Sequence, residues 1–154
     1  MRLTFCTLYG NQAPDGGGLT TQDDTMTGST PIIGISTIQN SLIAGNSAST
    51  QPDVAGNLTS LGYNLIQNGS SLQLQSTDLT DTPLSVLKID PSLQLNGSKT
   101  TKTHALLPGS PALDVIPLSA CYPTVNHVQI TTDQRGVKRP QEAQCDIGAY
   151  EYTP

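Results

Sequence analysis

The feature that most constrains the fold of this sequence is a short internal repeat. The segment TLYGNQA aligns with LIAGNSA through Gly10 and Gly45, which are 35 residues apart. The segment NLIQNG aligns with SLIAGN through Leu65 and Leu42, which are 23 residues apart. Repeats of about 20 to 50 residues are typical of solenoids and propellers. The chain is therefore expected to fold as a series of similar units.

Each repeat unit carries an apolar pair followed by Gly and Asn. In a parallel β-helix we expect such a pair to point into the stacked interior, and Gly or Asn to accept the left-handed backbone at a corner. The 23-residue spacing suits one full coil, and the 35-residue spacing suits a coil with an extra loop at 14–31. A propeller blade needs about 40 residues and aromatic anchors. The repeat therefore predicts a parallel β-helix.

The composition also favours β-structure. Only 35% of the 154 residues are hydrophobic and 12% are charged, which is unsuited to amphipathic helices. Clusters of Val, Ile and Thr between turn formers favour an ordered all-β chain over disorder. The expected strands cover 3–8, 32–37, 38–44, 53–59 and 63–67, with 71–76 as a further alternating candidate. Only 80–87 favours a helical turn or two.

The predicted organisation is a single domain in two parts. Residues 1–76 form coils, and residues 77–154, which are rich in Pro and Gly, form the last coil or coils and an irregular C-terminal cap. The chain begins with a strand pattern and has no signal-peptide pattern, so we expect export to be signalled elsewhere or the chain to be the tail of a longer protein.

The charge pattern excludes some partners. The net charge is −5 and the seven basic residues are dispersed, whereas a nucleic-acid partner requires a basic patch. No apolar run approaches the ~20 residues of a membrane span. We therefore expect neither nucleic acid nor a membrane span.

The charges gather in TDQRGVKRPQEAQCDIGAYEY at 132–152. Its carboxylates are candidates for glycoside hydrolysis, which needs two carboxylates about 5 to 9.5 Å apart: Asp133, Glu142, Asp146 and Glu151. The alternative is a structural cap, because Arg–carboxylate pairs hold irregular backbone together. We favour the cap, with Asp133, Arg135 and Asp146 as its central residues and Arg135 paired with Asp146.

The cysteines indicate a disulfide. Cys121 and Cys145 flank a loop and lie 24 residues apart, so a bridge between them would contribute about 3 kcal/mol. Cys6 remains as a small buried apolar residue. A disulfide indicates a location outside the cytosol.

No cofactor is expected. The cysteines lack CxxC spacing and the two histidines are far apart in the sequence, which argues against zinc. Asp23 and Asp24 offer carboxylates for calcium, but the loop lacks the spaced acidic residues of a dedicated site, so a solvated loop is the preferred interpretation.

Four segments carry a family resemblance. They are GNSASTQPDVAGNLTSLGYNLI at 45–66, DPSL at 90–93, THALLPGSPALD at 103–114 and the charged segment at 132–152. They resemble the C-terminal part of bacterial surface or secreted right-handed parallel β-helix proteins called choice-of-anchor Q domain proteins. The resemblance implies the last coils of a solenoid with a closing cap, a cell-surface context and no established reaction. A family-typical Gly is missing from LDVIPLSAC at 113–121.

Three function classes follow. The preferred one is a noncatalytic structural or adhesive module, extracellular or on the cell surface. The second is the end of a carbohydrate-active β-helix, a polysaccharide lyase or glycoside hydrolase whose cleft lies in further coils. The third is a glycan-binding module that uses a coil face or the loop at 14–31. Coil faces rich in Thr, Ser, Asn and Gln favour the first class over the other two.

The predicted N-terminal coil has an open edge. The strand at 2–8 has nothing before it to pair with, and unpaired strand edges invite association. We therefore expect association through this edge with a second copy of the chain or with upstream coils, and a surface glycan is a further candidate partner.

Overall fold

The computed structural model describes residues 1–21, 36–69 and 72–154. Its regular secondary structure is mainly β-strand, arranged in parallel sheets. The strands are β1 Arg2–Thr4, β2 Thr7–Tyr9, β3 Leu19–Thr21, β4 Ser36–Gln39, β5 Leu42–Ala44, β6 Val54–Gly56, β7 Leu58–Ser60, β8 Leu65–Ile66 and β9 Leu79–Thr80. Two short helices and a hairpin follow: α1 Leu84–Leu87, α2 Leu118–Cys121, β10 Thr124–Val125 and β11 Val128–Gln129.

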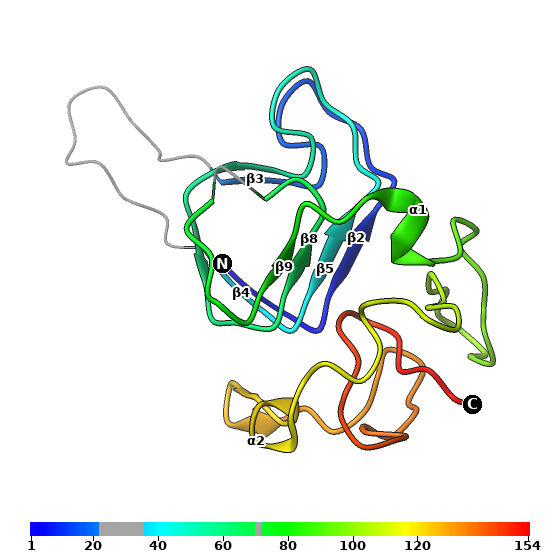
Figure 1. Cartoon of the computed structure of the whole chain (residues 1–154). Helices are drawn as coiled ribbons and strands as arrows, with labels where there is room; N and C mark the ends of the chain where they lie inside the picture. The colour runs from blue at the N-terminus through cyan, green and yellow to red at the C-terminus, as the bar shows by residue number, and fades with distance from the viewer. Residues whose placement is uncertain (22–35, 70–71) are drawn as a thin grey trace.

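The first nine strands form three parallel sheets, ordered β1-β4-β7, β2-β5-β8-β9 and β3-β6. Successive stretches of chain therefore stack as tiers: β1 to β3, β4 to β6, β7 with β8, and β9 (Figure 1). Leu8 pairs with Ile43, and Ile43 pairs with Ile66. These pairings confirm the 35- and 23-residue repeats as the register between tiers.

Side chains of the apolar pair point to opposite faces of the sheet. Ile43 packs with Ile38 and Val54 inside the tiers. Leu42 instead packs outside them, in a cluster with Ala112, Ile116 and Ile147 of the C-terminal region. The expectation that both residues point inward was wrong, because successive side chains of a strand alternate between its faces. The outer face of β5 is buried because the C-terminal region covers it.

One corner of the tiers is fixed by side-chain hydrogen bonds. Ser41 Oγ accepts the Cys6 N–H at 3.0 Å, and Asn64 Oδ1 accepts the Ser41 N–H at 3.0 Å. Asp78 Oδ1 then accepts the Asn64 N–H at 2.8 Å. We call Cys6, Ser41, Asn64 and Asp78 the corner ladder. Each tier uses a polar side chain to satisfy a main-chain donor of the preceding tier.

The expected strands are confirmed in part. The expected strand at 3–8 is divided between β1 and β2, because Phe5 adopts a left-handed conformation with φ of 52°. Residues 72–76 form no strand although their burial alternates, and residues 32–35 and 71 lie outside the described residues. Helix α1 lies within the predicted 80–87 segment, whereas α2 was not anticipated. In the described ranges, no helix is both long and apolar enough to cross a bilayer.

Candidate functional site

The charged segment folds into a buried cluster of two ion pairs. Arg135 Nη2 lies 2.7 Å from Asp133 Oδ2, and Arg139 Nη1 lies 2.5 Å from Glu151 Oε2. The expected pairing of Arg135 with Asp146 is corrected here, because Arg135 binds its near neighbour Asp133 instead. The two residues are only two positions apart, so this pairing follows from a local turn.

Asp133 organises that turn. Its Oδ1 accepts the N–H groups of Arg135 at 2.7 Å and Val137 at 3.0 Å. Its Oδ2 accepts the Arg135 Nε–H at 2.8 Å and the Glu151 N–H at 3.0 Å. The carboxylate therefore joins the turn at 133–137 to the end of the chain.

Asp146 and Glu151 are also occupied by main-chain donors. Asp146 accepts the N–H groups of Asp114 at 2.8 Å and Tyr152 at 2.6 Å. Glu151 accepts those of Gln141 at 3.2 Å and Asp146 at 3.1 Å. Both carboxylates thus hold irregular backbone segments together.

Arg139 lies at the centre of the cluster and is fully buried. Its guanidinium donates to the main-chain oxygens of Asp146 at 3.1 Å and Gly148 at 2.7 Å. Its Cζ lies 4.0 Å from the centre of the Phe5 ring, in the first tier. Arg139 therefore connects the C-terminal region to the tiers.

Arg135 extends the network. It donates to the main-chain oxygens of Asn96 at 2.9 Å and of Glu151. Its guanidinium also stacks over the Tyr150 ring, with Cζ 3.7 Å from the ring centre. A flat guanidinium suits such a combined role because it donates in its plane and stacks on its faces.

Burial dominates the electrostatics of the cluster. It raises the pKa of Glu151 to about 7, despite the opposing effect of Arg139. Burial likewise raises the pKa of Asp146 and lowers the pKa of Arg139. Loss of hydration disfavours the charged form of each group.

The geometry of the charged cluster suits a structural cap better than a catalytic pair of carboxylates. Asp133, Asp146 and Glu151 are each at most 6% exposed and accept main-chain N–H groups. Glu142, the fourth candidate carboxylate, is exposed. A glycosidase needs two carboxylates that can reach a sugar from opposite sides. The three buried groups face backbone instead.

The disulfide joins Cys121 to Cys145, as predicted, with the two Cα atoms 5.6 Å apart. Both residues are fully buried. The bridge ties the end of α2 to the segment that precedes Asp146. Cys6 is free and half-buried rather than part of the core, and its Sγ lies 3.6 Å from the Thr4 main-chain oxygen.

The described residues contain no cluster of three or more His, Cys, Asp or Glu side chains placed to hold a metal ion. Asp23 and Asp24, the candidate calcium ligands, lie outside the described residues.

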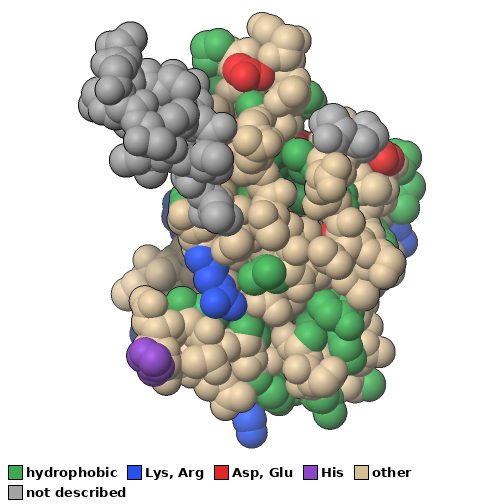
Figure 2. All heavy atoms as spheres, turned by 90° about the vertical axis from the view of Figure 1, so that its left-hand side faces the viewer, with side chains coloured by type: hydrophobic (Ala, Val, Ile, Leu, Met, Phe, Trp, Pro, Cys, Tyr) green, Lys and Arg blue, Asp and Glu red, His purple; other side chains and the backbone are tan. Residues whose placement is uncertain are grey.

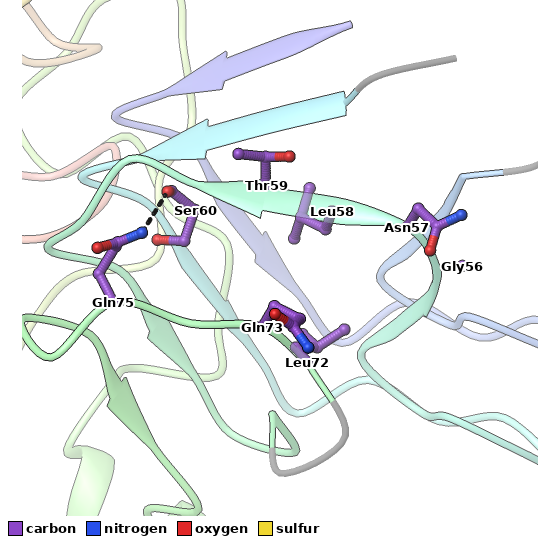
Figure 3. Close-up of a pocket in the computed structure, with 8 residues that line it drawn as sticks. All are labelled: Gly56, Asn57, Leu58, Thr59, Ser60, Leu72, Gln73 and Gln75. Carbon is purple, nitrogen blue, oxygen red and sulfur yellow. Dashed lines mark hydrogen bonds between the residues drawn. The ribbon is translucent and has the colours of Figure 1, made fainter. Parts of the chain in front are cut away.

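A second site, missed by the sequence reasoning, is a hollow of about 450 Å³ beside β7. We call it the β7 groove, and its lining residues are Gly56, Asn57, Leu58, Thr59, Ser60, Leu72, Gln73 and Gln75. Figure 3 shows 56–60 along one wall and 72–75 along the other. A hydrogen bond of 3.3 Å from Gln75 Nε2 to the Ser60 main-chain oxygen closes one end. The alternation of Leu and Gln at 72–75 was the only feature of the sequence that pointed to this groove.

Comparisons with known proteins gave no match: no family model, curated protein or solved structure is similar enough to this chain to be recognised. The family resemblance of the C-terminal segments therefore stays a prediction.

Proposed function

We propose that this chain is a noncatalytic structural or adhesive module. Its tiers would be the last coils of a right-handed parallel β-helix, and the residues after β9 would be the irregular C-terminal cap. One observation carries the proposal: the buried carboxylates of the charged cluster bind main-chain N–H groups and arginines, so they are committed to holding the backbone.

The connection between cap and tiers supports this role. The Gly148 N–H donates to the Asn40 main-chain oxygen at 2.9 Å, and the Ala149 N–H donates to Thr7 Oγ1 at 2.9 Å. Asn40 Nδ2 in turn donates to the Ala120 main-chain oxygen at 2.9 Å. A cap bonded to two tiers resists separation from them, which suits a structural or adhesive surface module.

The proposed location is extracellular or on the cell surface. The buried disulfide supports it, because disulfides persist mainly in oxidising compartments. On the face seen in Figure 2, the described charged side chains are few and scattered among uncharged atoms. A partner that meets this face would be recognised by uncharged polar chemistry, which suits a glycan or a polypeptide.

The test is an activity measurement on the whole chain. Incubation with polygalacturonate and alginate should release no unsaturated products that absorb in the ultraviolet, and neutral polysaccharides should gain no reducing ends. Release of either product, provided that it is lost in the Glu142→Gln variant or in a Glu151→Gln variant that remains folded, would establish the carbohydrate-active alternative and refute the structural role.

A further inference from the structure

Asp90 and Pro91 form the only Asp–Pro bond in the sequence. Asp–Pro bonds are the peptide bonds that break most readily in acid, because the Asp carboxyl group can attack its own main-chain carbonyl carbon and expel the proline nitrogen. The rate of such an attack depends on where the carboxyl group is held and on what binds the carbonyl oxygen. The structure specifies both.

The carboxyl group of Asp90 is held on the side of the bond to Pro91. Its Oδ1 accepts the Ser92 N–H at 2.8 Å, and its Oδ2 accepts a hydrogen bond from Gln94 Nε2 at 3.2 Å. Both donors follow Asp90 in the chain, so the side chain is turned forward, towards the Asp90–Pro91 bond. Pro91 and Ser92 are exposed, so water reaches this part of the chain.

A histidine binds the carbonyl oxygen of the same peptide bond. His104 Nδ1 lies 2.9 Å from the Asp90 main-chain oxygen. A carbonyl oxygen can only accept a hydrogen bond, so Nδ1 carries the proton and donates it. When the carbonyl carbon is attacked, negative charge develops on this oxygen, and a donor placed there stabilises it as an oxyanion hole does.

The fold brings His104 to this bond. The arm that follows Asp90 and the arm that carries His104 run antiparallel, and Gln94 and Thr103 exchange main-chain N–H bonds of 3.1 and 2.7 Å between them. The His104 ring also contacts the Tyr9 ring of the first tier, with the ring centres 4.8 Å apart. His104 lies 14 residues from Asp90 in the sequence, so the unfolded chain does not hold the donor in place.

We propose that the chain cleaves itself between Asp90 and Pro91. The protonated Asp90 carboxyl group adds to the Asp90 main-chain carbonyl carbon, and His104 stabilises the oxyanion that forms. The C–N bond then breaks, the carboxyl proton passes to the proline nitrogen, and Asp90 is left as a cyclic anhydride. Water opens the anhydride and leaves Asp90 as a free C-terminal residue. This single self-cleavage goes beyond the structural role proposed above and consumes only water.

The two pieces should stay together after cleavage. The piece that begins at Pro91 contains both cysteines of the disulfide, Cys121 and Cys145, and the whole charged cluster. It also keeps its bond to the tiers from the Gly148 N–H to the Asn40 main-chain oxygen. The cleaved protein should therefore keep its size in native solution and separate into two pieces only when it is denatured.

The test incubates the purified whole chain at about pH 5, where part of any Asp carboxyl population is protonated, and measures the masses of the denatured products. We expect pieces that correspond to 1–90 and 91–154. Hydroxylamine should trap the anhydride as a hydroxamate on Asp90. The same chain unfolded in urea measures the ordinary acid lability of the bond, and the folded chain should cleave at least about tenfold faster. Equal rates in the two states would overturn the proposal.

Variants separate the reaction from a purely structural role of the same contacts. Asp90→Asn can still accept the Ser92 N–H but cannot form an anhydride, so it should stay intact. His104→Phe keeps a ring beside Tyr9 but lacks the donor, and should slow cleavage about 100-fold. His127→Gln, at an exposed histidine, should cleave at the original rate.

Urea denaturation of each variant shows whether it is folded. The proposal is overturned if the folded original chain stays intact, or if folded His104→Phe cleaves as fast as the original chain. The comparison of the folded and urea-unfolded original chain decides the question without any variant, so a failure of His104→Phe to fold does not remove the test.

Discussion

Arg139 and Glu151 form an ion pair, 2.5 Å from Nη1 to Oε2, with side chains that are at most 1% exposed. The pair links two irregular segments of the chain, and Arg139 adds a contact with Phe5 in the first tier. Hydrogen-bonded strands cannot hold these segments, since they contain none. Side-chain hydrogen bonds take over that function, because Arg139 donates to main-chain oxygens and Glu151 accepts main-chain N–H groups.

Removal of one partner should therefore be costly. Glu151→Ala leaves a buried guanidinium without its carboxylate and should lower the free energy of unfolding by about 3 to 5 kcal/mol. Urea denaturation of the whole chain measures the change. Glu142→Ala, at an exposed position, is the matched control and should change stability by less than about 0.5 kcal/mol. Equal effects of the two variants would show that the ion pair is not what holds the cap.

Stability should fall as the pH rises from about 4.5 to about 7. Burial raises the pKa of Glu151 from 4.5 to about 7 in the folded protein. The folded state then holds the proton more tightly than the unfolded state, so the stabilisation is complete below pH 4.5 and lost as the pH passes the folded pKa. Asp146 acts in the same direction. Urea denaturation at several pH values checks this, and Glu151→Gln should flatten the profile. A stability that rises over this window would contradict the prediction, because it would mean that the attraction of Arg139 lowers the pKa of Glu151 more than burial raises it.

Loss of the disulfide should weaken the cap. A bridge between residues separated by 24 positions restricts the unfolded chain by about 3 kcal/mol. The double variant Cys121→Ala with Cys145→Ala should lose about that amount, whereas Cys6→Ala, at a free half-buried thiol, should lose less. Peptide mapping without reduction should show Cys121 linked to Cys145. A peptide in which Cys6 is linked to either residue would contradict this structure.

Two glycines with nearly equal backbone angles provide a test of tier spacing. Gly56 has φ of 90° and Gly97 has φ of 91°. A Cβ at Gly56 would lie 1.8 Å from the Thr21 main-chain oxygen, whereas one at Gly97 meets nothing within 4 Å. Gly97→Ala should cost about 1 to 2 kcal/mol from backbone strain alone. Gly56→Ala should cost several-fold more, because β3 and β6 must separate. Similar unfolding midpoints for the two variants would refute so close an approach of the tiers.

The first tier should mediate association. Its interior side chains Leu3, Leu8 and Leu19 are half-buried, whereas their partners in the second tier are at most 2% exposed: Ile38, Ile43 and Val54. Among the described residues, strands β1 to β3 each end their sheets, and unpaired strand edges beside apolar side chains favour association with another chain. Light scattering over a concentration series should show association, and Leu8→Lys should reduce it. A monomer at every concentration would indicate that this end needs no partner.

The register of the tiers was predictable from the sequence. The spacings of Gly10 with Gly45 and of Leu42 with Leu65 are the spacings at which the strands pair. This succeeds because stacked tiers place chemically similar residues above one another, so that the repeat in the chain is the repeat in space. The disulfide was also predictable, because two of three cysteines bracket one loop.

Only the tertiary structure decided the pairing inside the charged cluster. The sequence offered four carboxylates to two arginines within one short segment, and the predicted pairing of Arg135 with Asp146 was wrong. The partner of Arg139 depends on how the irregular backbone brings Glu151 back to it. The β7 groove could not be predicted from the sequence either. The alternation at 72–75 predicts a strand, but it does not show that this segment lies apart from β7. A local pattern determines which face of a segment is apolar, whereas the distance between two segments is set by everything that packs between them.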